Sequence, residues 1–100
     1  MSAKRVLLLG YEYVPDVLER RAPHREAHLA HIAEWHERGE LALAGTVGDP
    51  PSGAVFVFQL DDPARVEEFA AADPYVAAGL ISARRIEPWS IVAHRPLGDR

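Results

Sequence analysis

The stretch Ala54-Val55-Phe56-Val57-Phe58-Gln59-Leu60, followed at once by Asp61-Asp62-Pro63, decides the fold of this chain. Its β-branched and aromatic side chains predict a strand over 54–60. Aspartate before proline is typical of a helix start, because aspartate caps free N–H groups and proline has no N–H to lose. The sequence therefore predicts a strand that passes directly into a helix, whose apolar side chains share one face.

The same signals, read outward from this stretch, predict the remaining elements. Strands are expected over 6–13, 41–47 and 80–86, the last extended by 89–93 past Pro88; a helix is expected over 23–38, after a polar connection that runs to Arg21. Gly39 suits a left-handed helix end, and a short helical turn opens at Asp73-Pro74 and closes at Gly79. The order β-α-β-β-α-β predicts an α+β, ferredoxin-like fold with an antiparallel four-stranded sheet.

Composition limits the classes of function. The chain has 100 residues, 48% of them hydrophobic, a formal net charge of −4 and no cysteine. These values indicate a single domain over 1–94 with a flexible tail over 95–100, and they exclude thiolate catalysis and cysteine-bound zinc. Scattered basic residues disfavour a nucleic-acid partner, and no apolar run approaches the roughly 20 residues of a membrane span. We expect a cytoplasmic protein.

Both faces of the predicted sheet are apolar. Val55 and Val57 alternate with Phe56 and Phe58, and the first strand carries Val-Leu-Leu-Leu over 6–9. Since both helices of a ferredoxin-like fold cover one face, the other face would expose apolar side chains to water. A second copy packed sheet to sheet would cover it, and the sequence therefore predicts a homodimer.

A helical wheel of residues 23–38 places Ala22, Leu29, Ile32, Ala33 and His36 on one side, toward the core. Arg25 falls inside this apolar arc, and His28 lies at its edge with Trp35 along the same line. His24 and His31 lie further round, toward solvent.

Two hypotheses for this helix follow from its spacing. Arg25 could hold an anionic substrate while His28 moves a proton, or Arg25 could simply reach an acid while His28 packs as a structural histidine. His24, His28 and His31 also stand at metal-ligand spacing, but no further ligand is placed nearby, and we expect no metal.

Asp73 has the same two interpretations. As an aspartate before proline it is an ordinary helix cap. In a catalytic pair it would instead bind the His28 ring and fix its tautomer.

The motifs Arg25-x-x-His28-Leu29, Ala44-Gly45, Asp73-Pro74-Tyr75 with Gly79, and Pro88-Trp89 resemble the YciI-like (YCII-related domain) family over nearly the whole chain. The resemblance implies a dimeric α+β barrel of ferredoxin-like subunits, similar to muconolactone isomerases. It also implies a cleft in which His28 and Asp73 are the catalytic pair. Arg25 then becomes an anion-binding or orienting group, with Gly45 and Trp89 as candidates for the cleft wall.

One branch of that family resembles a dehydrochlorinase acting on a chlorinated hydroxyhydroquinone. The loop from Gly48 to Gly53 is shorter here than in members with an insertion, so the substrate does not carry over. We therefore expect a small enzyme without cofactors that uses His28 and Asp73 for acid–base chemistry on a small aromatic or anionic metabolite. The alternatives are a non-catalytic binding or accessory module, in which the same residues only hold a ligand, and a structural dimerisation unit.

Overall fold

The computed structural model of the chain describes residues 4–99. The first three residues of the predicted domain, and the last residue of the predicted tail, lie outside this range. The elements in chain order are β1 (Lys4–Tyr13), α1 (Val17–Arg20), α2 (Ala22–Glu37), β2 (Leu41–Val47), β3 (Gly53–Phe58), α3 (Pro63–Ala71), α4 (Pro74–Ala77) and β4 (Ile81–Ile91).

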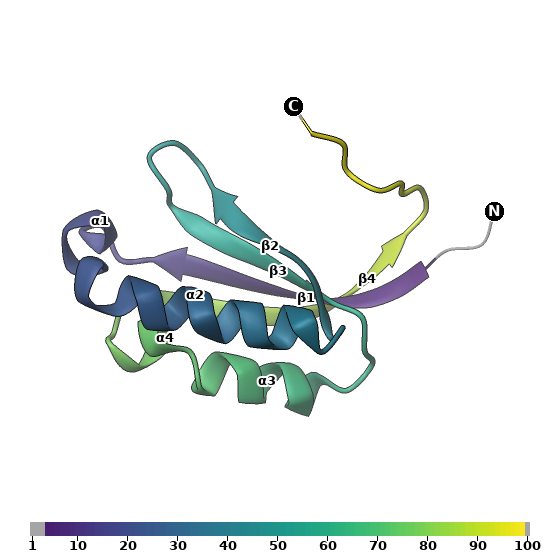
Figure 1. Cartoon of the computed structure of the whole chain (residues 1–100), viewed down its shortest axis with the longest axis horizontal. Coiled ribbons are helices and arrows are strands. Elements are labelled where there is room, and N and C mark those ends of the chain that lie inside the picture. Colours follow the sequence, from purple (N-terminus) through teal and green to yellow (C-terminus); the bar gives the residue numbers. More distant parts are fainter. Residues whose placement is uncertain (1–3, 100) are drawn as a thin grey trace.

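The strands form one antiparallel sheet in the order β2-β3-β1-β4, with β1 paired on both sides (Figure 1). This order confirms the ferredoxin-like fold predicted from the sequence. The pairing of β1 with β3 includes a close approach: a Cβ on Gly53 would lie 2.3 Å from the carbonyl oxygen of Tyr11. Only glycine fits there without moving a strand.

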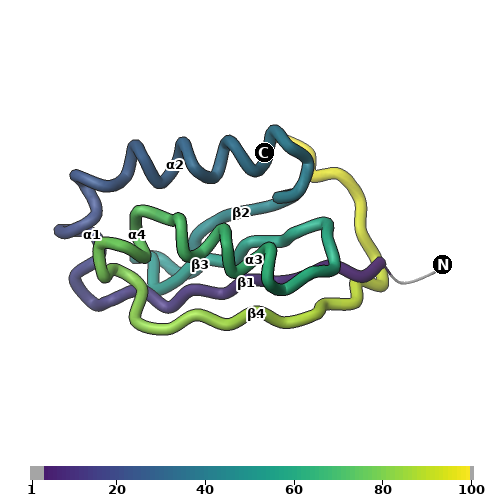
Figure 2. The backbone as a smooth tube through the Cα atoms, turned by 90° about the horizontal axis from the view of Figure 1, so that it is seen from below, coloured from purple at the N-terminus to yellow at the C-terminus, as the bar shows by residue number. Residues whose placement is uncertain are grey.

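The helices cover one face of the sheet. Alternate residues of β1, from Leu7 to Tyr13, point into the core together with Phe56 and Phe58 of β3. Helices α2 and α3 run side by side along this face in opposite directions (Figures 1 and 2). Their contribution to the core is a group of aromatic and apolar side chains: Trp35, Val66, Phe69 and Ala70. The layer between this face of the sheet and the helices is therefore buried and apolar, and the candidate site described below lies in that layer.

Most element boundaries agree with the sequence to within two or three residues. The predicted strand over 41–47 is β2 itself, and Gly39 ends α2 with a positive φ of 83°. Two details differ. The connection expected to be irregular contains the short helix α1, because Val17 buries its side chain in the core. Strand β4 runs through Pro88 without a break. Because β4 is an edge strand with β1 on one side only, a residue without an N–H is tolerated where no second strand needs a donor.

The other face of the sheet has no helix over it. The β2–β3 hairpin projects beyond the helices (Figure 1), and Leu43 and Val47 are each 50% exposed. Trp89 of β4 is 43% exposed. The register puts Trp89 beside Val6, and Leu43 beside Val57, so these exposed side chains belong to one continuous apolar surface. We call the surface of Leu43, Val47, Val57 and Trp89 the open face.

No helix within residues 4–99 is both long enough and apolar enough to cross a membrane. After β4, residues 92–99 contain neither helix nor strand, and Val92 and Leu97 are exposed.

Candidate active site

Asp73 is the most deeply buried charged residue of the described chain, with 0% exposure. It is the N-cap of α4, and its Oδ1 accepts a hydrogen bond of 3.0 Å from the Tyr75 backbone N–H. The same oxygen lies 2.7 Å from Nδ1 of His28, and Oδ2 accepts from the Tyr11 hydroxyl at 2.8 Å. Three donors thus converge on one carboxylate from three separate elements, which is what a buried acceptor needs.

The contact with Asp73 fixes the tautomer of His28. Because an ionised carboxylate only accepts hydrogen bonds, Nδ1 of His28 donates, and in the neutral ring Nε2 carries the lone pair. The Tyr75 ring packs flat against the imidazole, with centroids 3.6 Å apart and planes inclined by 5°. His28 is only 5% exposed. Within residues 4–99, Nε2 has no hydrogen-bond partner, and it is not sealed from solvent.

Tyr11 stays a donor to Asp73. Burial, followed by the neighbouring Asp73 carboxylate, raises the pKa of the Tyr11 hydroxyl far above its usual range. The hydroxyl therefore keeps its proton at any ordinary pH, and its bond to Oδ2 leaves Oδ1 for His28 and the α4 cap.

Helix α2 is rotated relative to the predicted wheel, and that prediction was wrong. The buried residues of α2 are His28 and Trp35, and its half-buried residues on the same line are His24, His31 and Ile32. Leu29 is 46% exposed, and Ala22, Arg25, Ala33 and His36 are exposed as well. The wheel failed because it assigned burial by apolarity. Here the core accepts histidines that bond through one ring nitrogen: His28 Nδ1 lies 2.7 Å from Asp73 Oδ1, and His31 Nε2 lies 2.9 Å from the Phe69 carbonyl oxygen.

The predicted site residues fall into two groups. His28 and Asp73 are in contact, as the catalytic hypothesis requires. Gly45 and Trp89 are elsewhere: they line a hollow of about 300 Å³ on the open face, on the opposite side of the sheet from Asp73. Arg25 is exposed on α2. Its charge acts on Tyr13, where it opposes the rise in pKa that burial causes.

Three tyrosines near the histidine were not among the predicted site residues. Tyr11 and Tyr13 lie on the core-facing side of β1, and Tyr75 follows the Asp73-Pro74 cap. The sequence did contain signals for them. Tyr11 and Tyr13 are alternate residues of one strand and therefore share a face, and Tyr75 stands two positions after the Asp73 cap. The sequence alone does not tell a core tyrosine from one whose hydroxyl meets a buried acid.

The three helix histidines do not gather into a metal site. His28 is bonded to Asp73 and His31 to the Phe69 carbonyl. Across the described residues, no group of three or more histidine, cysteine or acidic side chains is arranged to hold a metal ion.

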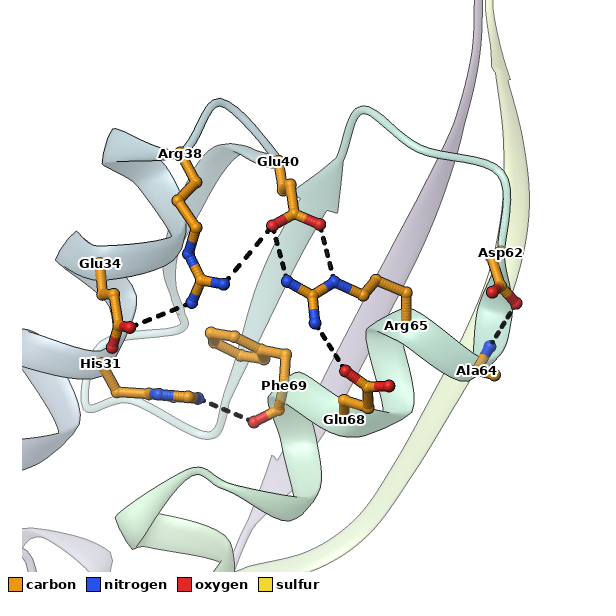
Figure 3. A network of polar contacts seen from close by, with 9 residues as sticks. All are labelled: His31, Glu34, Arg38, Glu40, Asp62, Ala64, Arg65, Glu68 and Phe69. Carbon is orange, nitrogen blue, oxygen red and sulfur yellow. Dashed lines mark hydrogen bonds and ion pairs between the residues drawn. The ribbon is translucent and has the colours of Figure 1, made fainter.

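The other end of α2 is fastened by charges at the surface (Figure 3). Arg65 of α3 binds both carboxylate oxygens of Glu40, at 2.8 and 2.9 Å, and Arg38 lies 3.8 Å from the same carboxylate. Both guanidinium groups also stack near the Trp35 ring, at 4.1 Å for Arg65 and 4.7 Å for Arg38. We call Trp35, Arg38, Glu40 and Arg65 the surface clamp; Arg38 also pairs with Glu34, and Arg65 with Glu68.

A larger hollow, of about 880 Å³, lies at the end of the sheet where α3 begins. Its wall includes Lys4, Arg5, Leu60 and Pro63. Neither His28 nor Asp73 borders this hollow or the one on the open face.

Comparison with known proteins agrees with the fold and the motifs. The chain is 33% identical over 86 residues to protein YciI of Escherichia coli, covering 77% of this chain and 88% of that protein. It is 31% identical over 88 residues to an uncharacterized protein of Haemophilus influenzae, covering 79% of this chain and 90% of the relative.

Among solved structures, 5-chloro-2-hydroxyhydroquinone dehydrochlorinase of Burkholderia phenoliruptrix, in complex with 2,5-dihydroxybenzoquinone, superposes with a TM-score of 0.71. The match has 23% sequence identity and covers 84% of this chain and 92% of that one. This likeness supports the fold. The YCII-related domain model matches residues 5–90, and the chain belongs to the YCII-related (YciI-like) family.

Proposed function

We propose that this protein is a small enzyme that works without a cofactor and uses His28 as a general base and acid, with Asp73 orienting it. The observation that carries the proposal is the unequal use of the two imidazole nitrogens. Nδ1 is fixed by a fully buried carboxylate, whereas Nε2 has a lone pair and no partner within the described residues. Histidine held in this way is suited to proton transfer near neutral pH.

In the proposed reaction, Nε2 takes a proton from a carbon next to a carbonyl carbon of the substrate. The C–H bond breaks, its electron pair forms a C=C bond to the carbonyl carbon, and the π electrons of the C=O bond move onto oxygen as an enolate, or as a phenolate where the ring becomes aromatic. The imidazolium then returns the proton to another atom, which completes an isomerisation. Alternatively, the electron pair expels a leaving group from the neighbouring carbon, which completes an elimination. Asp73 stays ionised throughout and stabilises the imidazolium.

The substrate class we propose is a small, planar and anionic metabolite. The dehydrochlorinase that shares this fold acts on a chlorinated hydroxyhydroquinone by its name, and its reaction is an elimination of this general kind. Burial raises the pKa of Tyr13, and the positive charges of Arg21 and Arg25 oppose this rise, which indicates that both arginines act on the side of the site where Tyr13 lies. Gly45 and Trp89 lie on the opposite side of the sheet, so we propose no substrate contact for them within the same chain.

A homodimer belongs to the proposal. The open face exposes Leu43, Val47 and Trp89 on a sheet that has no helix over it on that side. A second copy packed sheet to sheet would remove this apolar surface from water and leave the helix side, with His28, uncovered. Sedimentation analysis at micromolar concentration should give twice the monomer mass of 11.0 kDa, and a stable monomer would contradict this part.

The competing function is a binding module in which His28 and Asp73 serve only as hydrogen-bonding groups. The direct contact between His28 and Asp73, both at most 5% exposed, is compatible with it, because a binding site needs their hydrogen bonds and no release of a proton. The two functions differ in whether a proton moves.

The deciding experiment measures proton transfer directly. Small cyclic ketones, lactones and chlorinated hydroquinones are incubated with the protein in D₂O, and deuterium uptake at carbon and chloride release are followed. His28→Ala should lower the rate by about 10²–10⁴-fold, the usual contribution of a general base. His94→Ala is the matched control, because His94 is exposed after β4 and should leave the rate unchanged.

A His28→Ala variant that folds and retains the full rate would end the enzymatic proposal. Binding of 2,5-dihydroxybenzoquinone without any exchange or elimination would favour the binding module.

A further inference from the structure

The Tyr75 hydroxyl is the unexplained polar group of the site. Tyr75 is 1% exposed, and its Oη is the one sealed side-chain nitrogen or oxygen within residues 4–99 that lacks a hydrogen-bond partner. A buried hydroxyl without a partner lowers the stability of the folded state. Phenylalanine would fill the same space without that loss, so the hydroxyl calls for a partner that binds from outside the chain.

Two arginines act electrostatically on the tyrosines around this hydroxyl. Tyr13 and Tyr75 both belong to the buried core cluster. Burial first, and then the Tyr75 phenol, raise the pKa of Tyr13; Asp73 adds to this rise, and the charges of Arg21 and Arg25 oppose it. The first turn of α2, which carries Arg25, contains no acidic residue that would neutralise these cations.

The Tyr75 ring is also fixed relative to the base. It is stacked on the imidazole at 3.6 Å with nearly parallel planes, and its backbone N–H is bound to the same Asp73 oxygen as His28 Nδ1. The ring that carries the hydroxyl is therefore held in a fixed position against the imidazole. A donor that is fixed in advance stabilises developing charge most effectively.

We propose that the Tyr75 hydroxyl donates a hydrogen bond to an anionic oxygen, an enolate or phenolate, of a planar ligand bound beside His28. The inference rests on the proposed function and deepens it by naming the group that holds the oxygen. When a base removes a proton from carbon, negative charge accumulates on that oxygen, and an uncommitted donor in a poorly hydrated site favours it.

The first test uses stability and needs no ligand. Tyr75→Phe is compared with Tyr11→Phe by urea denaturation, because both variants delete one buried hydroxyl. Tyr11→Phe should lower the midpoint, since it breaks the bond to Asp73. Tyr75→Phe should keep or raise the midpoint, because its hydroxyl has no partner in the ligand-free protein. A clear fall for Tyr75→Phe would overturn the inference, because the hydroxyl would then have a partner, a protein group or trapped water, before any ligand binds.

The second test uses 4-nitrophenolate, a planar phenolate whose ionisation is visible by absorbance, as the probe. The wild type should bind the ionised form more tightly than the neutral phenol. Tyr75→Phe should lower the affinity for the phenolate by about tenfold or more, as expected for a hydrogen bond to a charged oxygen, and should reduce the preference for the ionised form. Equal affinity in both proteins, or no binding by the wild type at millimolar probe, would overturn the inference.

His28→Ala separates this inference from the proposed function. Tyr75-dependent binding of the phenolate, combined with a full proton-transfer rate in His28→Ala, would retain the Tyr75 inference and end the catalytic proposal. A slow His28→Ala variant, combined with unchanged phenolate affinity in Tyr75→Phe, would retain the catalytic proposal and end the Tyr75 inference.

Discussion

Two Asp-Pro pairs in this chain begin helices in the same way and have different surroundings. Asp62 caps α3 by accepting a 3.0 Å hydrogen bond from the Ala64 N–H, and Asp73 caps α4 by accepting one of the same length from the Tyr75 N–H. Asp62 is exposed and its side chain makes no further hydrogen bond within the described residues, whereas Asp73 is fully buried and its carboxylate binds His28 and Tyr11 in addition.

The two Asp-Pro pairs show that the motif accounts for helix capping, whereas its position in the fold accounts for burial and for further hydrogen bonds. Local chemistry explains the type of residue at both positions, since aspartate is a preferred helix cap. It does not explain why a carboxylate with two further donors is kept in a dry core, where charge is costly. We infer that the additional bonds of Asp73 serve the candidate site, while the single side-chain bond of Asp62 serves only its helix.

The largest expected effect is on stability when each carboxylate is removed. Asp73→Ala leaves three donors unsatisfied in the core and should lower the free energy of unfolding by about 3–5 kcal/mol. That is a large share of the roughly 5–15 kcal/mol typical of a domain. Asp62→Ala should cost only about 1 kcal/mol, the usual contribution of a cap. Equal losses of unfolding free energy in the two variants, measured by chemical denaturation, would show that both aspartates stabilise the protein only as helix caps.

A smaller effect is expected when each aspartate becomes asparagine. Asparagine caps helices as well as aspartate does, so Asp62→Asn should be nearly neutral. Asp73→Asn keeps the cap but turns an amide N–H₂ toward a donor, His28 or Tyr11, and should cost about 1–3 kcal/mol. Loss of the His28 Nδ1–H signal from the hydrogen-bonded region of the proton NMR spectrum would identify the broken contact. A neutral Asp73→Asn would mean that the site does not depend on the charge of the carboxylate.

The smallest effect concerns a third acid, Glu40 in the surface clamp. Hydrogen bonds from Arg65 lower the pKa of the Glu40 carboxyl below its ordinary value. A lowered folded-state pKa stabilises the protein above the unfolded pKa, and this contribution is lost as the pH falls through the folded value. Glu40→Gln should therefore cost at most about 1 kcal/mol at pH 7, given the partly exposed position of the pair.

The pH dependence provides the control for that prediction. The difference in unfolding free energy between wild type and Glu40→Gln should shrink as the pH falls from about 5 to below 4, where the carboxyl becomes protonated in both states. A difference that stays constant over this range would assign the effect of the substitution to packing against Trp35.

The fold was largely predictable because its signals are local. Strand residues alternate, Gly39 ends a helix with positive φ, and both Asp-Pro pairs start helices where expected. Helix α2 was the exception. Its orientation depends on hydrogen bonds from His28 and His31 to partners 45 and 38 residues away, and no periodicity in the helix encodes those partners.

The site was predictable in part. The contact between His28 and Asp73 was anticipated from the motifs and from the family resemblance. The phenols of Tyr11 and Tyr75 were not, since a tyrosine in a strand or a helical turn is most often a packing residue. Gly45 and Trp89 were placed with His28 by motif, but they belong to the opposite side of the sheet.

Because Gly53 lies close to the Tyr11 carbonyl oxygen, the position of the Tyr11 phenol depends on a residue that makes no polar contact with the site. A methyl group at position 53 would clash with the Tyr11 carbonyl oxygen, push β3 away from β1 one residue from the Glu12–Gly53 pair, and shift the phenol that meets Asp73. A saturation-mutagenesis scan should thus find position 53 nearly as intolerant as the acid itself, although a glycine there touches neither the histidine nor any ligand.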